Sequence, residues 1–197
     1  MIRQLHHKNL VPIHEVFASQ QGFFIISPYM DISLERINGS PRYPCEPQLA
    51  ELSREILYGI SYLASEGWTH SNINCSNVLL SLKDVGGARI TDIECCSKSA
   101  KGAAGRIDSK ALGIVMMKVM EKDSQPKGSF GLRHPERWSE DAVEFLSMTQ
   151  VSTPEKLAQH QFVANYKQHG SLVRLIAFTN VAAFGGFYNY DKSAELF

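Results

Sequence analysis

The sequence has no excess of charge of either sign. Its 197 residues include 20 basic and 20 acidic side chains, and hydrophobic residues make up 44% of the chain. A basic face is the usual electrostatic signature of proteins that bind nucleic acid or anionic membranes. Neither partner is therefore expected, and the length and composition fit one globular domain, with or without a tail.

Long hydrophobic runs are also missing. No long apolar segment precedes a cleavage site near the N-terminus, so a signal peptide is not expected. The longest apolar stretches, residues 113–120 and 172–187, are short or interrupted by polar side chains such as Arg174. A helix that spans a bilayer needs about 20 consecutive apolar residues, so we expect a soluble chain with no membrane contact.

Cysteine pairs at metal-binding spacing do not occur. The four cysteines are Cys45, Cys75, Cys95 and Cys96, and no two of them form a C-x-x-C pair. Adjacent cysteines, such as the last two, form a disulfide only with strain. We therefore expect reduced thiols, no zinc finger, and an intracellular, cytoplasmic protein.

The periodicity of the apolar residues predicts an α+β fold. Runs of β-branched and aromatic residues predict strands, the first two joined as a hairpin, and amphipathic stripes predict helices. The strands are expected at residues 10–17, 22–27, 78–82 and 88–91, and the helices at residues 47–63, 108–120 and 140–148. We expect residues 68–70 and 97–105 to be loops, and an aromatic tail after residue 162.

Short motifs follow one another in a fixed order between these elements. They are L-H-H-K-N-L-V at 5–11, F-F-I-I-S-P-Y-M at 23–30, H-S-N-I-N-C-S-N-V-L-L at 70–80, I-T-D-I-E at 90–94, D-S-K-A-L-G-I-V at 108–115, A-V-E-F-L at 142–146, P-E-K at 154–156 and H-Q-F at 160–162. In this order they resemble segments of a eukaryotic protein kinase. The resemblance covers residues 1–163. It implies a kinase-like fold, with a mainly helical C-lobe and a residual hairpin corresponding to the family's fourth and fifth strands.

The resemblance divides the chain into three parts. Residues 1–37 would be a residual N-lobe, residues 38–164 the C-lobe, and residues 165–197 a C-terminal extension. The family's glycine-rich loop, ATP-binding lysine and C-helix glutamate normally lie upstream of the point where this sequence starts. Without their backbone N–H groups and charges around the phosphates, we expect weak binding of ATP and Mg²⁺, or none.

Asn72 occupies the place of the kinase catalytic base. The family has an aspartate there, which accepts the proton of the substrate hydroxyl, whereas a carboxamide is not a base near neutral pH. Asn74 occupies the place of the lysine that neutralises the γ-phosphate. Ser71 replaces an arginine that in many kinases receives an activation-loop phosphate. The resemblance therefore implies that no catalytic side chain of this loop is intact.

Two metal-binding positions are retained. Asn77 and Asp92 align with the oxygen ligands of Mg²⁺ in the family, although both residue types also favour ordinary turns. Glu94 replaces the glycine of the D-F-G motif, which adds a carboxylate and removes backbone freedom. This carboxylate would support an unusual metal or repel phosphate.

The nucleotide-binding positions follow from the same alignment. Pro28 and Met30 match the hinge residues that face adenine, with Ser27 at the gatekeeper position before them. A proline is tolerated there because only its carbonyl is needed. Leu79 would form the floor of the adenine site, although it would belong to the apolar core in any fold.

Three further residues have structural interpretations. We expect His70 to be bonded to nearby backbone. Asp108 either caps a helix N-terminus or, as in the family, holds the catalytic loop from below. Leu157 replaces the arginine that in kinases pairs with the glutamate of the A-P-E motif, which is also missing, so neither partner of that ion pair would be left alone.

Three functional hypotheses follow. The first is a catalytically impaired, pseudokinase-like domain with a binding or regulatory role toward an unidentified protein partner. The alternative is an ATP-dependent protein kinase of the serine/threonine type, or a fragment of one, with weak activity. A third hypothesis, an unrelated α+β domain, predicts no cleft between the hairpin and the helices.

Overall fold

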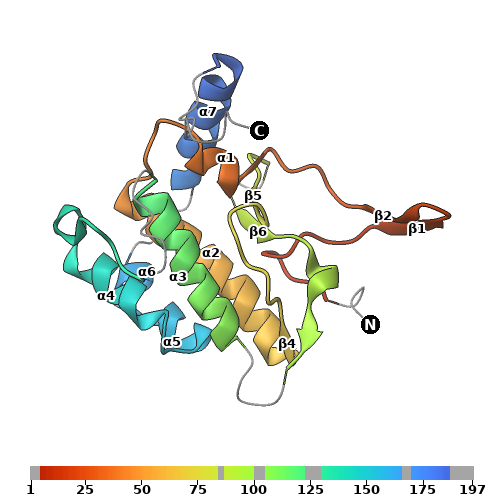
Figure 1. Ribbon diagram of the computed structural model, residues 1–197, viewed down its shortest axis with the longest axis horizontal. Coiled ribbons are helices and arrows are strands. Elements are labelled where there is room, and N and C mark those ends of the chain that lie inside the picture. The colour runs from red at the N-terminus through yellow and green to blue at the C-terminus, as the bar shows by residue number, and fades with distance from the viewer. Residues whose placement is uncertain (1–4, 84–86, 100–104, 123–129, 166–169, 187–197) are drawn as a thin grey trace, which may run out of the picture.

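The computed structural model describes residues 5–83, 87–99, 105–122, 130–165 and 170–186. A hairpin precedes a mainly helical body that contains small strand pairings (Figure 1). The strands are β1 (Glu15–Ser19), β2 (Gly22–Ile26), β3 (Ile32–Ser33), β4 (Trp68–Thr69), β5 (Val78–Leu80), β6 (Ala88–Ile90) and β7 (Ser97–Lys98). The α-helices are α1 (Leu34–Asn38), α2 (Glu46–Ser65), α3 (Arg106–Met120), α4 (Glu140–Met148), α5 (Pro154–Ala158), α6 (Gln161–Ala164) and α7 (Ser171–Phe184), and the 3₁₀ helices are η2 (Ile93–Cys95) and η3 (Pro135–Arg137).

β1 and β2 form an antiparallel hairpin that projects away from the helices (Figure 1). Glu15 pairs with Ile26 at its base, and Gly22 closes the turn with a φ of 138°, which favours glycine. Phe23 and Phe24 are 79% and 55% exposed. The hairpin is present as a structural element, while its equivalence to the family's fourth and fifth strands is still a prediction.

The first strand of this hairpin starts later than residue 10, where the sequence placed it. Leu10 and Val11 are buried and lie beside β6. Leu10 makes an isolated bridge to Ile90, the N–H of Val11 donates to the Ile90 carbonyl (2.8 Å), and the Ile90 N–H donates to the Asn9 carbonyl (2.9 Å). This pairing with a distant segment fixes the base of the hairpin to the body.

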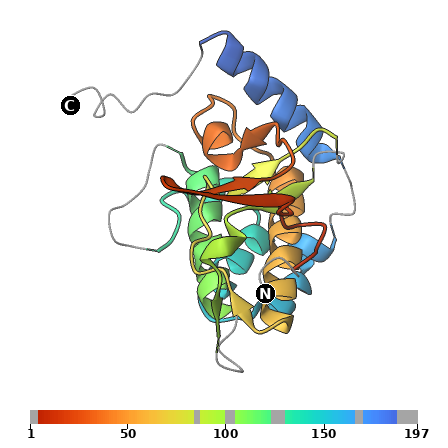
Figure 2. The same cartoon turned by 90° about the vertical axis from the view of Figure 1, so that its right-hand side faces the viewer.

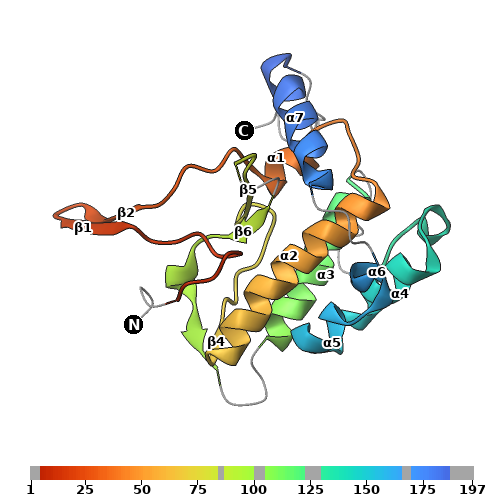
Figure 3. The same ribbon diagram turned by 180° about the vertical axis from the view of Figure 1, so that it is seen from behind.

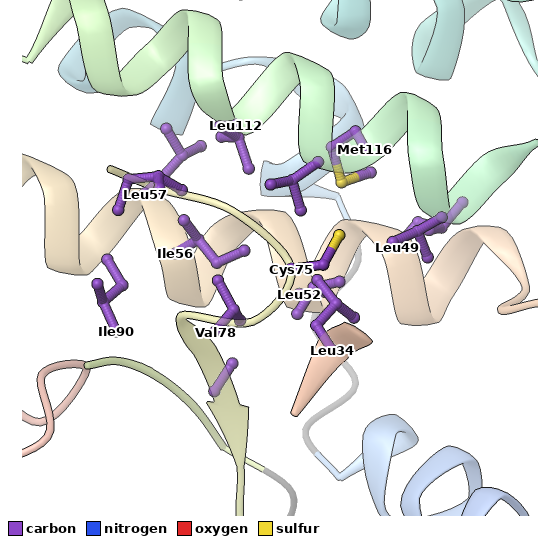
Figure 4. Packing of buried hydrophobic residues seen from close by; sticks show 14 of the residues in the cluster. Leu34, Leu49, Leu52, Ile56, Leu57, Cys75, Val78, Ile90, Leu112 and Met116 are labelled. Atoms are coloured by element: carbon purple, nitrogen blue, oxygen red, sulfur yellow. The ribbon is translucent and has the colours of Figure 1, made fainter. Parts of the chain in front are cut away.

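α2 is the central helix of the body and packs along α3 (Figure 3). Its N-terminus is capped by Gln48, whose side chain accepts the N–H of Cys45 (3.0 Å). Pro47 lies in the first turn, where a backbone N–H would have no partner within the helix, so its missing N–H costs nothing. Figure 4 shows the resulting core. Its labelled residues are Leu49, Leu52, Ile56 and Leu57 of α2, Leu112 and Met116 of α3, and Leu34, Cys75, Val78 and Ile90. Each fully buried aliphatic side chain contributes about 1.5–3 kcal/mol.

The remaining strands form two small sheets. β5 lies between β3 and β6, with Ile32 opposite Leu80 and Val78 opposite Ile90. β4 pairs with β7, so the prediction that residues 68–70 and 97–105 are only loops is wrong for Trp68–Thr69 and Ser97–Lys98. Two-residue strands carry no periodic signal, and they form because the chain brings these segments together.

The segment after residue 162 was expected to be an aromatic tail, but it contains helix α7. Figure 2 shows α7 along one side of α1, and its buried residues pack against α1 and α2. These residues are Leu172, Leu175, Ile176 and Thr179. The buried Glu51 of α2 accepts the N–H groups of Gly170 (2.8 Å) and Ser171 (2.9 Å) and the Ser171 hydroxyl. This carboxylate therefore caps the N-terminus of α7.

The structure tests two predictions, that the cysteines are reduced and that no helix crosses a membrane. All four cysteines are free, two of them buried and two exposed. None of the helices in the described part of the chain combines the length and apolar character needed to cross a bilayer. A cytoplasmic location is still a prediction.

Candidate functional site

A buried carboxylate holds the loop between β4 and β5. Asp108 of α3 is fully buried, and its two oxygens accept the N–H groups of His70 and Ser71, each at 2.8 Å. The N-cap of α3 is Gly105. Asp108 therefore holds the loop backbone, the second of its two predicted roles, and does not cap the helix.

Burial and hydrogen bonding act in opposite directions on this carboxylate. Burial raises the pKa of Asp108, and the N–H groups of His70 and Ser71 oppose that rise. Ser71 has a φ of 63°, a left-handed conformation that is unfavourable for a residue other than glycine. Such conformations persist where surrounding contacts determine them, and the bond from Ser71 N–H to Asp108 is one such contact.

His70 joins this loop to the segment that carries Asp92. The ring is fully buried, and its Nε2 lies 2.7 Å from the carbonyl oxygen of Thr91. Its Nδ1 accepts the N–H of Asn72 (3.3 Å). Because one nitrogen accepts and the other faces a carbonyl, the ring carries its proton on Nε2. The structural role predicted for His70 is confirmed.

Three asparagines bind one another in the loop. The Asn74 amide donates to the side-chain oxygen (3.1 Å) and the carbonyl oxygen (3.2 Å) of Asn72, and the Asn77 amide also donates to that carbonyl (2.8 Å). The Asn74 oxygen accepts the N–H groups of Ser76 (2.8 Å) and Asn77 (3.2 Å). The exposed Asn72 thus presents a neutral amide that is already hydrogen-bonded, and Asn74 presents no positive charge.

Asn77 and Asp92 are brought next to each other. The Thr91 N–H donates to the Asn77 carbonyl (2.9 Å), so the residue before Asp92 is bonded to the backbone of Asn77. Asp92 has a φ of 58°, and with Ser71 it is one of two residues other than glycine with positive φ among the described residues. Backbone strain of this kind is concentrated at functional sites.

The side-chain chemistry of these two residues is compatible with the predicted magnesium ion that also binds phosphate. The Asn77 amide nitrogen is used within the loop, which leaves its oxygen for a cation, and Asp92 supplies a half-buried carboxylate. Mg²⁺ in proteins is typically held by one or two carboxylates, with phosphate and water completing its shell. Within the described residues no group of three or more His, Cys, Asp or Glu side chains could hold a metal, so phosphate or water would have to complete this site.

A cavity of about 160 Å³ separates the base of the hairpin from the Asp92 segment. It is lined by Val11, Ile13, Ile25, Ser27, Thr91, Asp92, Ile93 and Glu94. It brings the predicted gatekeeper Ser27 together with Asp92 and Glu94, which contradicts the hypothesis of a domain without a cleft. Pockets for small molecules usually measure about 300–1,000 Å³, so this cavity alone is too small for a nucleotide.

The predicted adenine-contacting residues lie outside this cavity. Pro28 and Met30 are half-buried in the segment between β2 and β3. This segment joins β5 where the Asp31 N–H donates to the Leu80 carbonyl (3.0 Å). Leu79 is half-buried in β5, one residue away. The three positions are thus on neighbouring segments, while contact with adenine is still a prediction.

The sequence motifs did not predict the apolar lining of the cavity, but they account for one buried residue of the core. Val11, Ile13 and Ile25 line the cavity. Val11 and Ile25 belong to the motifs at 5–11 and 23–30, but the sequence predicted no role in the site for any of the three. Leu157, predicted to stand at the place of the family's buried arginine, is fully buried in the core. A leucine there leaves no buried charge to pair.

Comparison with known proteins identifies the family. The model of the protein kinase domain matches residues 1–112 of the 197. The chain therefore belongs to the protein kinase domain family, and its fold is a kinase domain of mixed helix and sheet content.

Similar curated proteins are serine/threonine or cyclin-dependent kinases. Cyclin-dependent kinase 12 of Caenorhabditis elegans is 28% identical over 112 residues, which cover 48% of this chain and 15% of that protein. Serine/threonine-protein kinase STE20 of Candida glabrata is 23% identical, over 80% of this chain and 21% of that protein. Serine/threonine-protein kinase shk1/pak1 of Schizosaccharomyces pombe is 29% identical, over 89% and 33%. The chain thus spans a third or less of the length of these relatives.

Proposed function

We propose that this kinase-family chain does not transfer phosphate efficiently and acts by binding a protein partner. The observation that carries the proposal is Asn72, a neutral amide at the place of the catalytic base, bonded to the equally neutral Asn74 (3.1 Å). Loss of a positioned acid or base typically costs about 10²- to 10⁴-fold in rate. The missing lysine charge at Asn74 removes a further stabiliser of the transferred phosphoryl group.

Within this loop, Asn72 and Asn74 lack the reactive groups of the family, whereas His70 and Asp108, which hold the loop backbone, are kept. Asp108 and His70 hold the loop with hydrogen bonds of 2.8 Å and 2.7 Å. The backbone that would carry a restored aspartate and lysine is therefore already fixed, and phosphate transfer by such variants can be tested. The test is a radiolabelled ATP transfer assay on the unmutated chain, on Asn72→Asp, and on Asn72→Asp combined with Asn74→Lys. We expect no transfer from the unmutated chain, and robust transfer from it would overturn the proposal.

Binding of ATP with Mg²⁺ is a separate part of the proposal. Asn77 and Asp92 would hold the ion, and Pro28, Met30 and Leu79 would contact adenine, with weak affinity because the present cavity measures only about 160 Å³. The test is a thermal-shift titration with ATP and Mg²⁺, since a ligand that binds only the folded state raises the melting temperature. A shift that needs Mg²⁺ and is lost in Asp92→Ala supports the site, whereas no shift at millimolar ATP refutes it.

The alternative function is a weak serine/threonine-type protein kinase, or a fragment of one. The relatives named above are kinases, and the loop scaffold and both metal-ligand positions support this alternative. The same transfer assay decides between the two, because only the alternative gives activity that Asp92→Ala removes from the unmutated chain.

A further inference from the structure

A second hollow lies away from the catalytic loop, between η3 and the first two turns of α4. Its volume is about 470 Å³, and its lining residues are Pro135, Glu136, Trp138, Glu140, Val143 and Glu144. This volume lies within the range of about 300–1,000 Å³ that is usual for ligand pockets. Figures 1 and 3 show α4 on the side of the body opposite the β1–β2 hairpin. We call this hollow the α4 groove.

Three of the six residues that line the α4 groove are glutamates, here called the rim carboxylates, and none of the six is basic. Glu140 and Glu144 are one turn apart on α4 and therefore share a face, with Val143 beside them. Glu136, the third, belongs to η3. Its own backbone N–H and the neighbouring His134 lower the pKa of Glu136, which keeps it ionised. Glu136 also lies 3.0 Å from His134 Nδ1 and beside Arg137 in the sequence, and Glu144 lies 3.5 Å from His160 Nε2. Glu140 has no such neighbour among the described residues, and the lining as a whole carries an excess of carboxylates.

The other three residues that line the groove are apolar or aromatic. Trp138 is half-buried, and its indole N–H is shielded from solvent without an acceptor among the described residues. The part of the ring that solvent reaches is therefore carbon. Pro135 and Val143 complete the apolar surface. An aromatic ring that lines the same groove as several carboxylates is the combination that suits a cation with an aliphatic stem.

The groove is held in shape before any ligand binds. The backbone N–H of Trp138 donates to the Pro135 carbonyl (3.1 Å). Ser139, the N-cap of α4, donates through its N–H and its hydroxyl to the two carboxylate oxygens of Glu46 on α2, both at 2.7 Å. These bonds fix the junction between η3 and α4 to the central helix. Such preorganisation lowers the entropy lost on binding.

We propose that the α4 groove binds an arginine-containing segment of a protein partner. The aliphatic stem of the arginine would lie on Trp138, Pro135 and Val143, and its guanidinium would contact the ring and the rim carboxylates. Arginine fits better than lysine because its planar head stacks on aromatic rings and binds carboxylates through two hydrogen bonds. This inference rests on the proposed binding role and names the chemistry of the partner.

The first experiment uses Trp138 as its own reporter. Trp68 is the other tryptophan of the sequence, so Trp68→Phe leaves a single indole, in the groove. The probe is the blocked peptide Gly-Leu-Arg-Arg-Leu-Gly, and the control peptide has glutamine in place of both arginines. We expect a saturable change in fluorescence with the arginine peptide and affinity about tenfold lower for the control, from two ion pairs at an exposed rim. Equal affinity for both peptides, or no saturable change, would overturn the proposal.

The second experiment removes the rim charge without changing shape. In the Trp68→Phe background, Glu136→Gln with Glu140→Gln should weaken binding of the arginine peptide about tenfold, whereas Glu155→Gln, an exposed residue of α5, should leave it unchanged. Glu144 is left intact because it also lies 3.5 Å from His160. Thermal melts check that each variant is folded.

The two proposals can fail independently. Unchanged binding of the arginine peptide in the double variant would refute the proposed ligand of the groove. Dimerisation of the chain in sedimentation analysis that the double variant abolishes would also refute it, because a second copy would then occupy this face. Neither result bears on Asn72, because phosphate transfer is measured in a separate assay and Asn72 does not line the groove.

Discussion

Replacement of Asp108 by alanine should loosen the loop that carries Asn72 and destabilise the whole domain. The carboxylate is fully buried and accepts two backbone N–H groups at 2.8 Å. A hydrogen bond to a charged group contributes about 1.5–3 kcal/mol, and part of this sum offsets the cost of burying the charge. We therefore expect Asp108→Ala to lower the free energy of unfolding by about 3 kcal/mol, because it leaves the His70 and Ser71 N–H groups without their acceptor.

The measurement is urea unfolding followed by circular dichroism. A loss of this size corresponds to roughly 10 °C in melting temperature for a chain of this length. Lys110→Ala is the matched control, since Lys110 is exposed on the same helix. A loss below about 1 kcal/mol, the scale of a single neutral hydrogen bond, would refute the argument that this carboxylate holds the loop.

The pH dependence of the same residue gives an independent check. Burial raises the pKa of Asp108 in the folded state, so the folded protein binds the proton more tightly than the unfolded chain does. This contribution to stability is complete below the unfolded value of about 3.9 and is lost as the pH rises through the folded-state pKa. The stability of the unmutated protein relative to Asp108→Asn should therefore fall as the pH rises through that window. A difference that grows with pH would contradict the raised pKa.

Three further predictions concern packing and reactivity. Glu51→Ala should destabilise α7 by about 2 kcal/mol, because α7 loses its cap, and unchanged hydrogen exchange of α7 would contradict this. Gly113→Ala should cost about 1–3 kcal/mol, since the new Cβ would lie 2.1 Å from Oγ1 of Thr149; an unchanged melting temperature would show that the helices separate without cost. Burial raises the pKa of Cys75 and of Cys96 to about 12, so iodoacetamide should label the two exposed cysteines first, and equal labelling rates by mass spectrometry would contradict this.

The sequence predicted those elements whose signal is local. The central helix has a long apolar stripe and an N-terminal proline, and it was expected at residues 47–63 and is found at Glu46–Ser65. The helix Glu140–Met148 agrees in both bounds because Ser139 caps it, accepting the Ala142 N–H (3.3 Å).

Elements that depend on distant partners were not predictable in this way. The strand β4 exists because residues 97–98 pair with it. The helix α7 begins where the Glu51 carboxylate, more than a hundred residues earlier, accepts its first N–H groups. The cavity beside Asp92 likewise takes Val11 and Ile13 from the segment before the hairpin and Ile25 from β2, and no local pattern predicts that these side chains meet the Asp92 segment.

The contrast between buried and exposed positions explains how this loop would keep its shape after the loss of reactive groups that we propose. His70 and Asp108 are fully buried and bonded to backbone atoms, so replacing either one leaves polar groups unpaired in the interior, at a cost of about 1–3 kcal/mol each. Ser71 and Asn72 are exposed, and substitutions at exposed positions usually change stability by no more than about 0.5 kcal/mol. Stability therefore constrains the scaffold of the loop but not its catalytic side chains. Intact loop geometry in a member of this family is thus poor evidence for phosphate transfer. The transfer assay, run on the unmutated chain and on Asn72→Asp, is what distinguishes a loop that only keeps its shape from one that also transfers phosphate.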